Sequence, residues 1–233
     1  MRVVVLGTGT NVGKTFVTCR LAEALLELGG PGRVLALKPV ESGVTEGDLG
    51  DAGLIAVAAG HSPRLSPWRL SRPVSPHLAA RSQGLRIELA RVRDWVSDQE
   101  SSSPLPSDRT AALSPPRVTL VETAGGVLSP LSELATNLDL ALALEPALWL
   151  LVAHDSLGVL HDVSATLRAL PRPPDAVVLS SARAADASSG TNAAELRRLG
   201  IADVLQEFRA DRQAAAGLAQ WVLARHQKPV IRA

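Results

Sequence analysis

Apolar and polar residues follow one another along the chain with the spacing of strands and helices in turn. Residues 3–6 are four apolar, mostly β-branched residues, which predict a buried strand. From Phe16 to Leu28 the apolar positions recur at helical spacing, and a Gly-Gly-Pro-Gly stop follows. Residues 33–37 then predict a second strand. A strand, a helix and another strand imply a right-handed crossover with parallel strands.

The same alternation continues to the end of the chain. It predicts further buried strands at 117–121, 148–153 and 176–179, and helices at about 52–59, 76–83, 88–97, 137–144, 157–170, 192–199 and 211–225. Asp51, Ser75 and the pair Asp155-Ser156 are the expected N-caps of three of these helices. Residues 98–116 are rich in Ser and Pro and have no period, so we expect a surface loop there.

The turn between the first strand and the first helix has the composition of a phosphate-binding loop. It contains Gly-Thr-Gly-Thr-Asn-Val-Gly-Lys-Thr at residues 7–15. Unpaired N–H groups and the dipole at the start of a helix favour an anion there, and Lys14 can reach the outer phosphates while Thr15 ligates Mg²⁺. The usual motif would place its first glycine at Thr8, one residue after Gly7. The context favours one P-loop NTPase-like α/β domain over residues 1–233, with a mostly parallel sheet and helices on both faces.

Polar side chains also follow two other predicted strands. Lys38 and Ser42 come after the second strand, and Glu122 ends the strand at 117–121, directly before a segment with a glycine pair. Because ligands of parallel α/β sheets bind at the carboxyl ends of strands, we expect these residues beside the phosphate-binding loop. Glu122 and Asp51 are candidate Mg²⁺ ligands, and the glycine pair can present N–H groups to phosphate.

The composition of the chain limits the partners and the compartment that we expect, and it draws attention to the lysines. The net charge of +1 gives no reason to expect a nucleic acid or an anionic membrane as partner. A single cysteine, Cys19, excludes an internal disulfide, and with no export signal in the sequence we expect a cytoplasmic protein. Lysine stands only at positions 14, 38 and 228, so two of the three lysines fall next to predicted strand ends. A compact, mobile ammonium is useful at such places, and arginine does not replace it.

Four segments, in their order and spacing, resemble the dethiobiotin synthetase family. They are residues 7–15, Lys-Pro-Val-Glu-Ser-Gly at 38–43, Ser-Pro-His-Leu-Ala-Ala at 75–80 and Val-Glu-Thr-Ala-Gly-Gly at 121–126. The resemblance covers about residues 3–145. It implies a homodimer that joins CO₂ to the two amines of diaminopelargonic acid, using ATP and Mg²⁺. A carbamate forms on one amine, ATP phosphorylates it, and the second amine closes the cyclic urea.

The resemblance also implies roles for individual residues. Lys14 and Lys38 would be catalytic, flanking the carbamate and the γ-phosphate. The substrate would be bound by Thr10, Lys38 and Ser42, and Mg²⁺ by Thr15, Asp51 and Glu122. The nucleotide would be bound by Asn11, Val12, Gly13, Lys14, Thr15, Phe16, Asp51, Glu122, Thr123, Ala124 and Gly125.

The chain departs from the family pattern at several positions. Thr123 replaces a usual glycine, and the effect of its Cβ on the backbone of the phosphate loop stays open. Ser180-Ser181 stand where an asparagine usually reads the purine, so the nucleotide preference stays open; residues 157–162 and 206–209 also differ. Two alternatives remain: a switch ATPase of the partition type, whose signature lysine would stand at Gly9, and a relative with another substrate.

Overall fold

The central element of the protein is a parallel β-sheet. The computed structural model describes residues 1–103, 117–181, 183–202, 204–208 and 212–226. Within these ranges six parallel strands pair in the order β2-β5-β1-β6-β7-β8. Their bounds are β1 Arg2–Gly7, β2 Val34–Leu37, β5 Val118–Glu122, β6 Ala147–His154, β7 Ala176–Ser180 and β8 Val204–Phe208. The sequence predicted five of these strands and missed β8.

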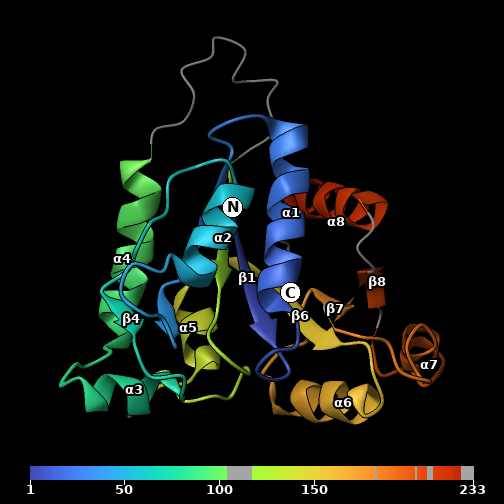
Figure 1. The fold of residues 1–233 in the computed structure, drawn as a ribbon. Coiled ribbons are helices and arrows are strands. Elements are labelled where there is room, and N and C mark those ends of the chain that lie inside the picture. Colours follow the sequence, from blue (N-terminus) through green and yellow to red (C-terminus); the bar gives the residue numbers. More distant parts are fainter. Residues whose placement is uncertain (104–116, 182, 203, 209–211, 227–233) are drawn as a thin grey trace.

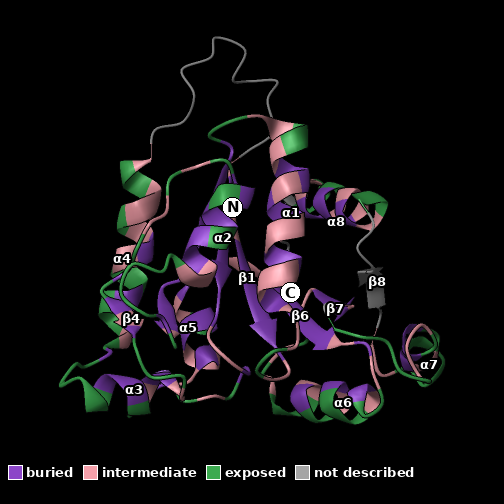
Figure 2. Ribbon diagram, viewed as in Figure 1, coloured by how far each residue is buried: buried purple, intermediate pink, exposed green. Residues whose placement is uncertain are grey.

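Helices cover both faces of this sheet (Figure 1). One face packs against α1 Lys14–Gly29, α2 Gly50–Ala58 and α8 Arg212–His226, and the other side of the molecule holds α3 Pro76–Ser82, α4 Leu89–Ser102, α5 Asn137–Ala143, α6 Val159–Ala169 and α7 Asn192–Arg198. Successive residues of β1 point to opposite faces: Val3 and Val5 join the first core, Val4 and Leu6 the second. Strands β1, β2, β5, β6 and β7 are therefore largely buried on both sides (Figure 2), which confirms the predicted α/β architecture.

A second, small sheet lies beside the main one. Its strands, β3 Val40–Ser42 and β4 Trp68–Leu70, are parallel and place Glu41 opposite Arg69. The sequence did not predict either strand, because three residues are too few to show an alternating pattern. Trp68 and Leu70 are buried in the core that contains α3 and α4.

The expected surface loop at 98–116 is wrong over its first residues. Helix α4 continues to Ser102, five residues beyond its predicted end, while residues 104–116 lie outside the described ranges. Hydroxyl groups bond back along the helix, Ser101 Oγ to the Ser97 carbonyl at 2.9 Å and Ser103 Oγ to the Gln99 carbonyl at 2.8 Å. Serine in the last turns was therefore compatible with a helix.

Two of the predicted N-caps are also wrong. Helix α2 begins at Gly50 with Leu49 as its N-cap, so Asp51 lies inside the first turn. Helix α6 begins at Val159, because Gly158 adopts the left-handed conformation that starts it. Asp155 instead accepts hydrogen bonds from Gly190 N–H and Asn192 Nδ2, both at 2.7 Å. Ser75 does precede α3 as predicted, although its side chain makes no capping bond.

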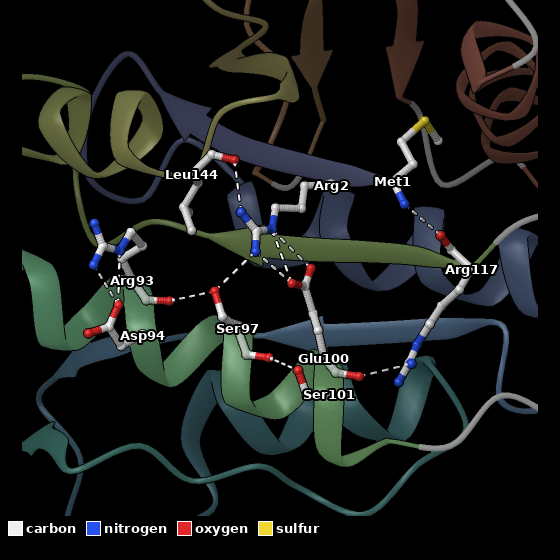
Figure 3. A network of polar contacts seen from close by, with 9 residues as sticks. All are labelled: Met1, Arg2, Arg93, Asp94, Ser97, Glu100, Ser101, Arg117 and Leu144. Carbon is white, nitrogen blue, oxygen red and sulfur yellow. Dashed lines mark hydrogen bonds and ion pairs between the residues drawn. The ribbon is translucent and has the colours of Figure 1, made fainter.

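The amino ends of the strands carry a network of polar contacts (Figure 3). Arg2 Nε lies 3.0 Å from Glu100 Oε1, and Arg2 Nη2 lies 2.7 Å from Glu100 Oε2. Arg2 Nη1 donates to the Leu144 carbonyl, and the Met1 ammonium donates to the Arg117 carbonyl at 3.0 Å. These contacts join β1 to α4 and to the start of β5.

Within the part of the chain described here, no helix has both the length and the apolar character needed to cross a membrane.

Candidate active site

Strand order brings the predicted site residues together. In the sheet β5 lies between β2 and β1, so the carboxyl ends of these three strands are neighbours. Lys38 follows β2, Glu122 is the last residue of β5, and the loop over residues 8–13 follows β1. Segments that are far apart in the sequence thus meet at one edge, as the carboxyl-end rule predicts.

The loop after β1 has the backbone of an anion-binding turn. Gly13 and Asn11 have φ of 93° and 59°, and Asn11 is the one non-glycine with positive φ among the described residues. Helix α1 starts directly after Gly13 without a side-chain cap, which leaves its first N–H groups for a ligand. Lys14 folds back so that Nζ donates to the Gly9 carbonyl at 3.0 Å. A Cβ on Gly7 would lie 3.0 Å from Lys14 Cδ, which explains a glycine at this position.

Four predicted residues form a connected cluster under this loop. Lys38 Nζ donates to Glu122 Oε1 at 2.8 Å and also to Asp51 Oδ2. Thr15 Oγ1 donates to the same Glu122 oxygen at 2.7 Å. Glu122 is fully buried and Lys38 nearly so. Burial opposes the charge of Lys38, but Glu122 and Asp51 hold the pKa of this ammonium above its ordinary value.

The second lysine lies in a different electrostatic setting. Burial lowers the pKa of Lys14 to about 8; Glu122 raises it in part, and the neighbouring charge of Lys38 lowers it. Among the described residues its hydrogen bond goes to a backbone carbonyl and not to a carboxylate. A buried cation without a bonded counter-ion gains strongly from an anionic ligand.

Several buried oxygens of the site have no hydrogen-bond partner in the part of the chain described. They are Glu122 Oε2, Ser42 Oγ and Thr8 Oγ1. Buried polar atoms are normally paired, so these three indicate places for ligand groups. Thr15, Asp51 and Glu122 offer only oxygen donors, which is the chemistry that Mg²⁺ prefers, and a Mg²⁺ site usually needs few protein ligands. Among the described residues, no group of three acidic, histidine or cysteine side chains is arranged for a metal.

The loop after β5 approaches the phosphate-binding loop closely. A Cβ on Gly126 would lie 3.2 Å from Gly9 Cα, and Gly125 has a φ of 84°. Thr123, in contrast, has ordinary backbone angles and is buried, with Oγ1 donating to the Val5 carbonyl at 3.0 Å. The backbone at position 123 therefore accommodates a Cβ.

A residue that the sequence did not single out shapes this loop. Asn137, the first residue of α5, is fully buried and donates from Nδ2 to the Ala124 carbonyl and, at 2.9 Å, to the Gly126 carbonyl. The capping box of Thr136 and Asp139 fixes the start of the same helix. The contact of Asn137 with the loop depends on tertiary structure, so no local pattern in the sequence predicts it.

The other predicted residues lie around this centre. Thr10 is exposed at the tip of the loop, where its hydroxyl would lie 3.6 Å from a Cβ on Gly125. Val12 and Phe16 are partly buried against the core beside α1. Ser42 contributes, with Thr15 and Asp51, to the wall of a pocket of about 1100 Å³ that extends between α1 and α2.

These features define a P-loop protein that binds a nucleotide at the carboxyl edge of a parallel sheet. A family model described as an AAA domain matches residues 1–212. Proteins named ATP-dependent dethiobiotin synthetase BioD are 40% identical over 171 residues in Caulobacter sp. strain K31 (71% of this chain, 68% of that one) and 35% identical over 202 residues in Anaeromyxobacter dehalogenans strain 2CP-C (84% and 83%). The one from Rhodopirellula baltica is 33% identical over 219 residues (83% and 78%). The chain belongs to the dethiobiotin synthetase family.

A solved structure shows the same fold in a different class of protein. The chain is similar to a ParA family ATPase from Chlorobium tepidum TLS, with a TM-score of 0.51, 16% sequence identity, and coverage of 96% of this chain and 92% of that one. At this identity the likeness concerns the fold alone. The resemblance to dethiobiotin synthetases expected from the sequence is confirmed, and the partition ATPases are related by structure only.

Proposed function

We propose that this chain is an ATP-dependent dethiobiotin synthetase, which joins CO₂ to diaminopelargonic acid in a cyclic urea. One observation carries the proposal: Lys38, Glu122, Asp51 and Thr15 form one bonded cluster beneath a phosphate-binding loop. Membership of the family supplies the reaction class. The geometry supplies the charged groups that phosphoryl transfer to a carbamate needs.

Lys14 and Lys38 would make the main contribution of this chain to catalysis. Phosphoryl transfer depends on positioning and on neutralising the charge of the transferring group. Lys38 keeps its charge because two carboxylates raise its pKa, and Lys14 is a buried ammonium that an anion would stabilise. We assign the carbamate and the γ-phosphate to the space between them.

The remaining residues would bind and orient the substrates. Thr15, Asp51 and Glu122 would hold Mg²⁺, which when bound neutralises charge on the phosphate oxygens. The ATP phosphates would lie against residues 11–16 and 122–125, where backbone N–H groups and glycines allow close approach. Thr10 and Ser42 would orient the diamine; the unpartnered Ser42 hydroxyl supports this role.

We also propose a cytoplasmic homodimer. Two leucines with exposed fractions of 98% (Leu134) and 85% (Leu157) support an interface, because such side chains are stabilised when a partner covers them. Sedimentation equilibrium of the purified chain tests the dimer directly.

The function is tested by a coupled measurement of two products. Phosphate release is followed with Mg²⁺, bicarbonate and each of the four ribonucleoside triphosphates, with and without diaminopelargonic acid, while dethiobiotin is detected by mass. We expect dethiobiotin and diamine-dependent phosphate release, and the ranking of nucleotides gives the base preference. Nucleotide binding without diamine-dependent turnover would instead indicate a relative with another substrate.

A further inference from the structure

Glu41 is a buried carboxylate next to the site, and it is not one of the residues proposed to bind a ligand. It lies in β3, is 4% exposed, and its Oε1 accepts a hydrogen bond from the backbone N–H of Asp51. Asp51 is the residue whose side chain contacts Lys38. Glu41 thus holds the backbone of a residue that belongs to the cluster.

The contact between Glu41 and the start of α2 is close. Gly50 has a φ of +59°, and a Cβ on it would lie 2.6 Å from Glu41 Oε1. A side chain at position 50 would therefore displace the carboxylate. The N-cap Leu49 makes no side-chain capping bond. Glu41, in strand β3, instead supplies the acceptor for the Asp51 N–H that a capping residue normally provides. Its negative charge also suits the amino end of the helix.

Arg69 completes the arrangement from β4. The register of the small sheet places it opposite Glu41, and its Nη2 donates to the Asp48 carbonyl. Arg69 Nε lies 3.8 Å from Glu41 Oε2, and both of these atoms are buried without a hydrogen-bond partner in the structure. The arginine therefore places a positive charge near Glu41 and fixes the segment that leads into α2.

We propose that Glu41 and Arg69 are positioning residues that set the place of the Asp51 carboxylate relative to Lys38 and Glu122. Neither side chain is assigned a contact with substrate. They act through the start of α2, and the pairing of β3 with β4 holds the two residues opposite each other. The inference rests on the proposed function only in taking Asp51 as a ligand of Mg²⁺.

The test measures how much Mg²⁺ strengthens nucleotide binding. The dissociation constant of a fluorescent ATP analogue is determined with Mg²⁺ and with EDTA for the wild type, Glu41→Ala and Glu41→Gln. In Glu41→Ala we expect the factor by which Mg²⁺ strengthens nucleotide binding to fall about tenfold, the usual effect of removing a group that orients a metal ligand. The dissociation constant in EDTA should stay unchanged. Glu41→Gln keeps an oxygen acceptor for the Asp51 N–H and should recover most of the loss.

Two further variants separate positioning from folding. Glu195→Ala removes a first-turn carboxylate, ion-paired with Arg198, from α7 and should leave the Mg²⁺ effect unchanged. Arg69→Met keeps Glu41 but removes the bond to Asp48, and should shift the Mg²⁺ effect in the same direction as Glu41→Ala. Thermal melting shows whether each variant is folded. If Glu41→Ala does not fold, Arg69→Met carries the test.

The outcomes also distinguish this inference from the proposed function. A folded Glu41→Ala or Arg69→Met protein with the wild-type Mg²⁺ effect would overturn the inference, as would a wild type whose nucleotide binding ignores Mg²⁺. A reduced Mg²⁺ effect in a protein that makes no dethiobiotin would support the positioning role and reject the biotin assignment.

Discussion

The two ends of the central sheet carry ion pairs of opposite character. At the amino end Arg2 and Glu100 are about a fifth exposed, and all three nitrogens of the guanidinium donate hydrogen bonds within the chain. At the carboxyl end Lys38 and Glu122 are almost completely buried, and Glu122 Oε2 has no partner in the described structure. At the amino end the polar atoms of the ion pair bond to other groups of the protein. At the carboxyl end one carboxylate oxygen is left without a partner among the described residues and can bond to a ligand.

This difference separates a contact that serves stability from one that serves binding. A buried ion pair pays a large desolvation cost, which its Coulomb attraction often fails to repay. Well-packed apolar residues of similar size often stabilise such a position at least as well. Its charges are therefore best explained by the chemistry proposed for the site, whereas the amino-end pair needs no ligand to explain it.

The largest effect is expected from removing the charge at the carboxyl end. Lys38→Ala should reduce dethiobiotin formation by about a thousandfold, because one preorganised charge on the transferring group is lost. Nucleotide binding should stay nearly intact, since the phosphate-binding loop and Lys14 are unchanged. The measurement pairs the rate of product formation with the dissociation constant of an ATP analogue. Unchanged turnover would remove Lys38 from the mechanism.

A charge-conserving variant is the control for this experiment. Lys38→Arg keeps a cation beside Glu122 and Asp51, so it should preserve the ion pairs more fully than alanine does. It should still be slow, because a planar guanidinium does not replace a compact ammonium. Wild-type turnover in Lys38→Arg would show that neutralisation of the carboxylates is the main role of the side chain.

A medium effect is expected where the loop after β5 depends on a buried amide. Asn137→Ala leaves the carbonyls of Ala124 and Gly126 without their donor, so the free energy of unfolding should fall by about 2–3 kcal/mol. Nucleotide affinity should fall as well. Thr136→Ala removes the cap of the same helix and should cost about 1 kcal/mol without changing that affinity. Equal affinities in the two variants would contradict a role of Asn137 in the site.

Much of the carboxyl end could be predicted from local sequence. The apolar runs of β1, β2 and β5 and the polar residues that follow them were enough to identify Lys14, Lys38 and Glu122 as neighbours of one rim. This succeeds because strands buried on both faces are continuous apolar runs, and because parallel strands end at the same edge.

The parts that sequence reasoning missed depend on tertiary contacts. The roles of Glu41 and Asn137 follow from hydrogen bonds to segments 10 to 13 residues away, and no local residue pattern predicts these bonds. Strands β3 and β4 are too short for a period, and the start of α2 is capped from β3. The extension of α4 follows from serines that bond back along the helix and from Glu100, which meets Arg2 across 98 residues.

A smaller effect should show that Lys38 and a metal share the same carboxylates. The ammonium of Lys38 is ion-paired with both Glu122 and Asp51, the two carboxylates proposed to hold the metal. Lys38→Met removes this charge while keeping an unbranched side chain that is one atom shorter, so Mn²⁺ should bind the nucleotide-free protein about tenfold more tightly, a gain of about 1.4 kcal/mol. The free Mn²⁺ signal in electron paramagnetic resonance gives the affinity. Weaker binding than in the wild type would refute this competition.

The smallest effect is expected at the amino end, and it should depend on pH. Burial alone would raise the pKa of Glu100, but the hydrogen bonds and charge of Arg2 hold it below its ordinary value. The unfolded chain therefore takes up the proton first, and the stabilisation is present at neutral pH and lost as the pH falls through the lowered pKa. Glu100→Gln should cost about 1 kcal/mol at pH 7 and less at acidic pH. Denaturant unfolding across this range measures it. Asp94→Asn, in an exposed pair on the same helix, should change little; a cost for Glu100→Gln independent of pH would show that packing, not charge, holds this end of the sheet.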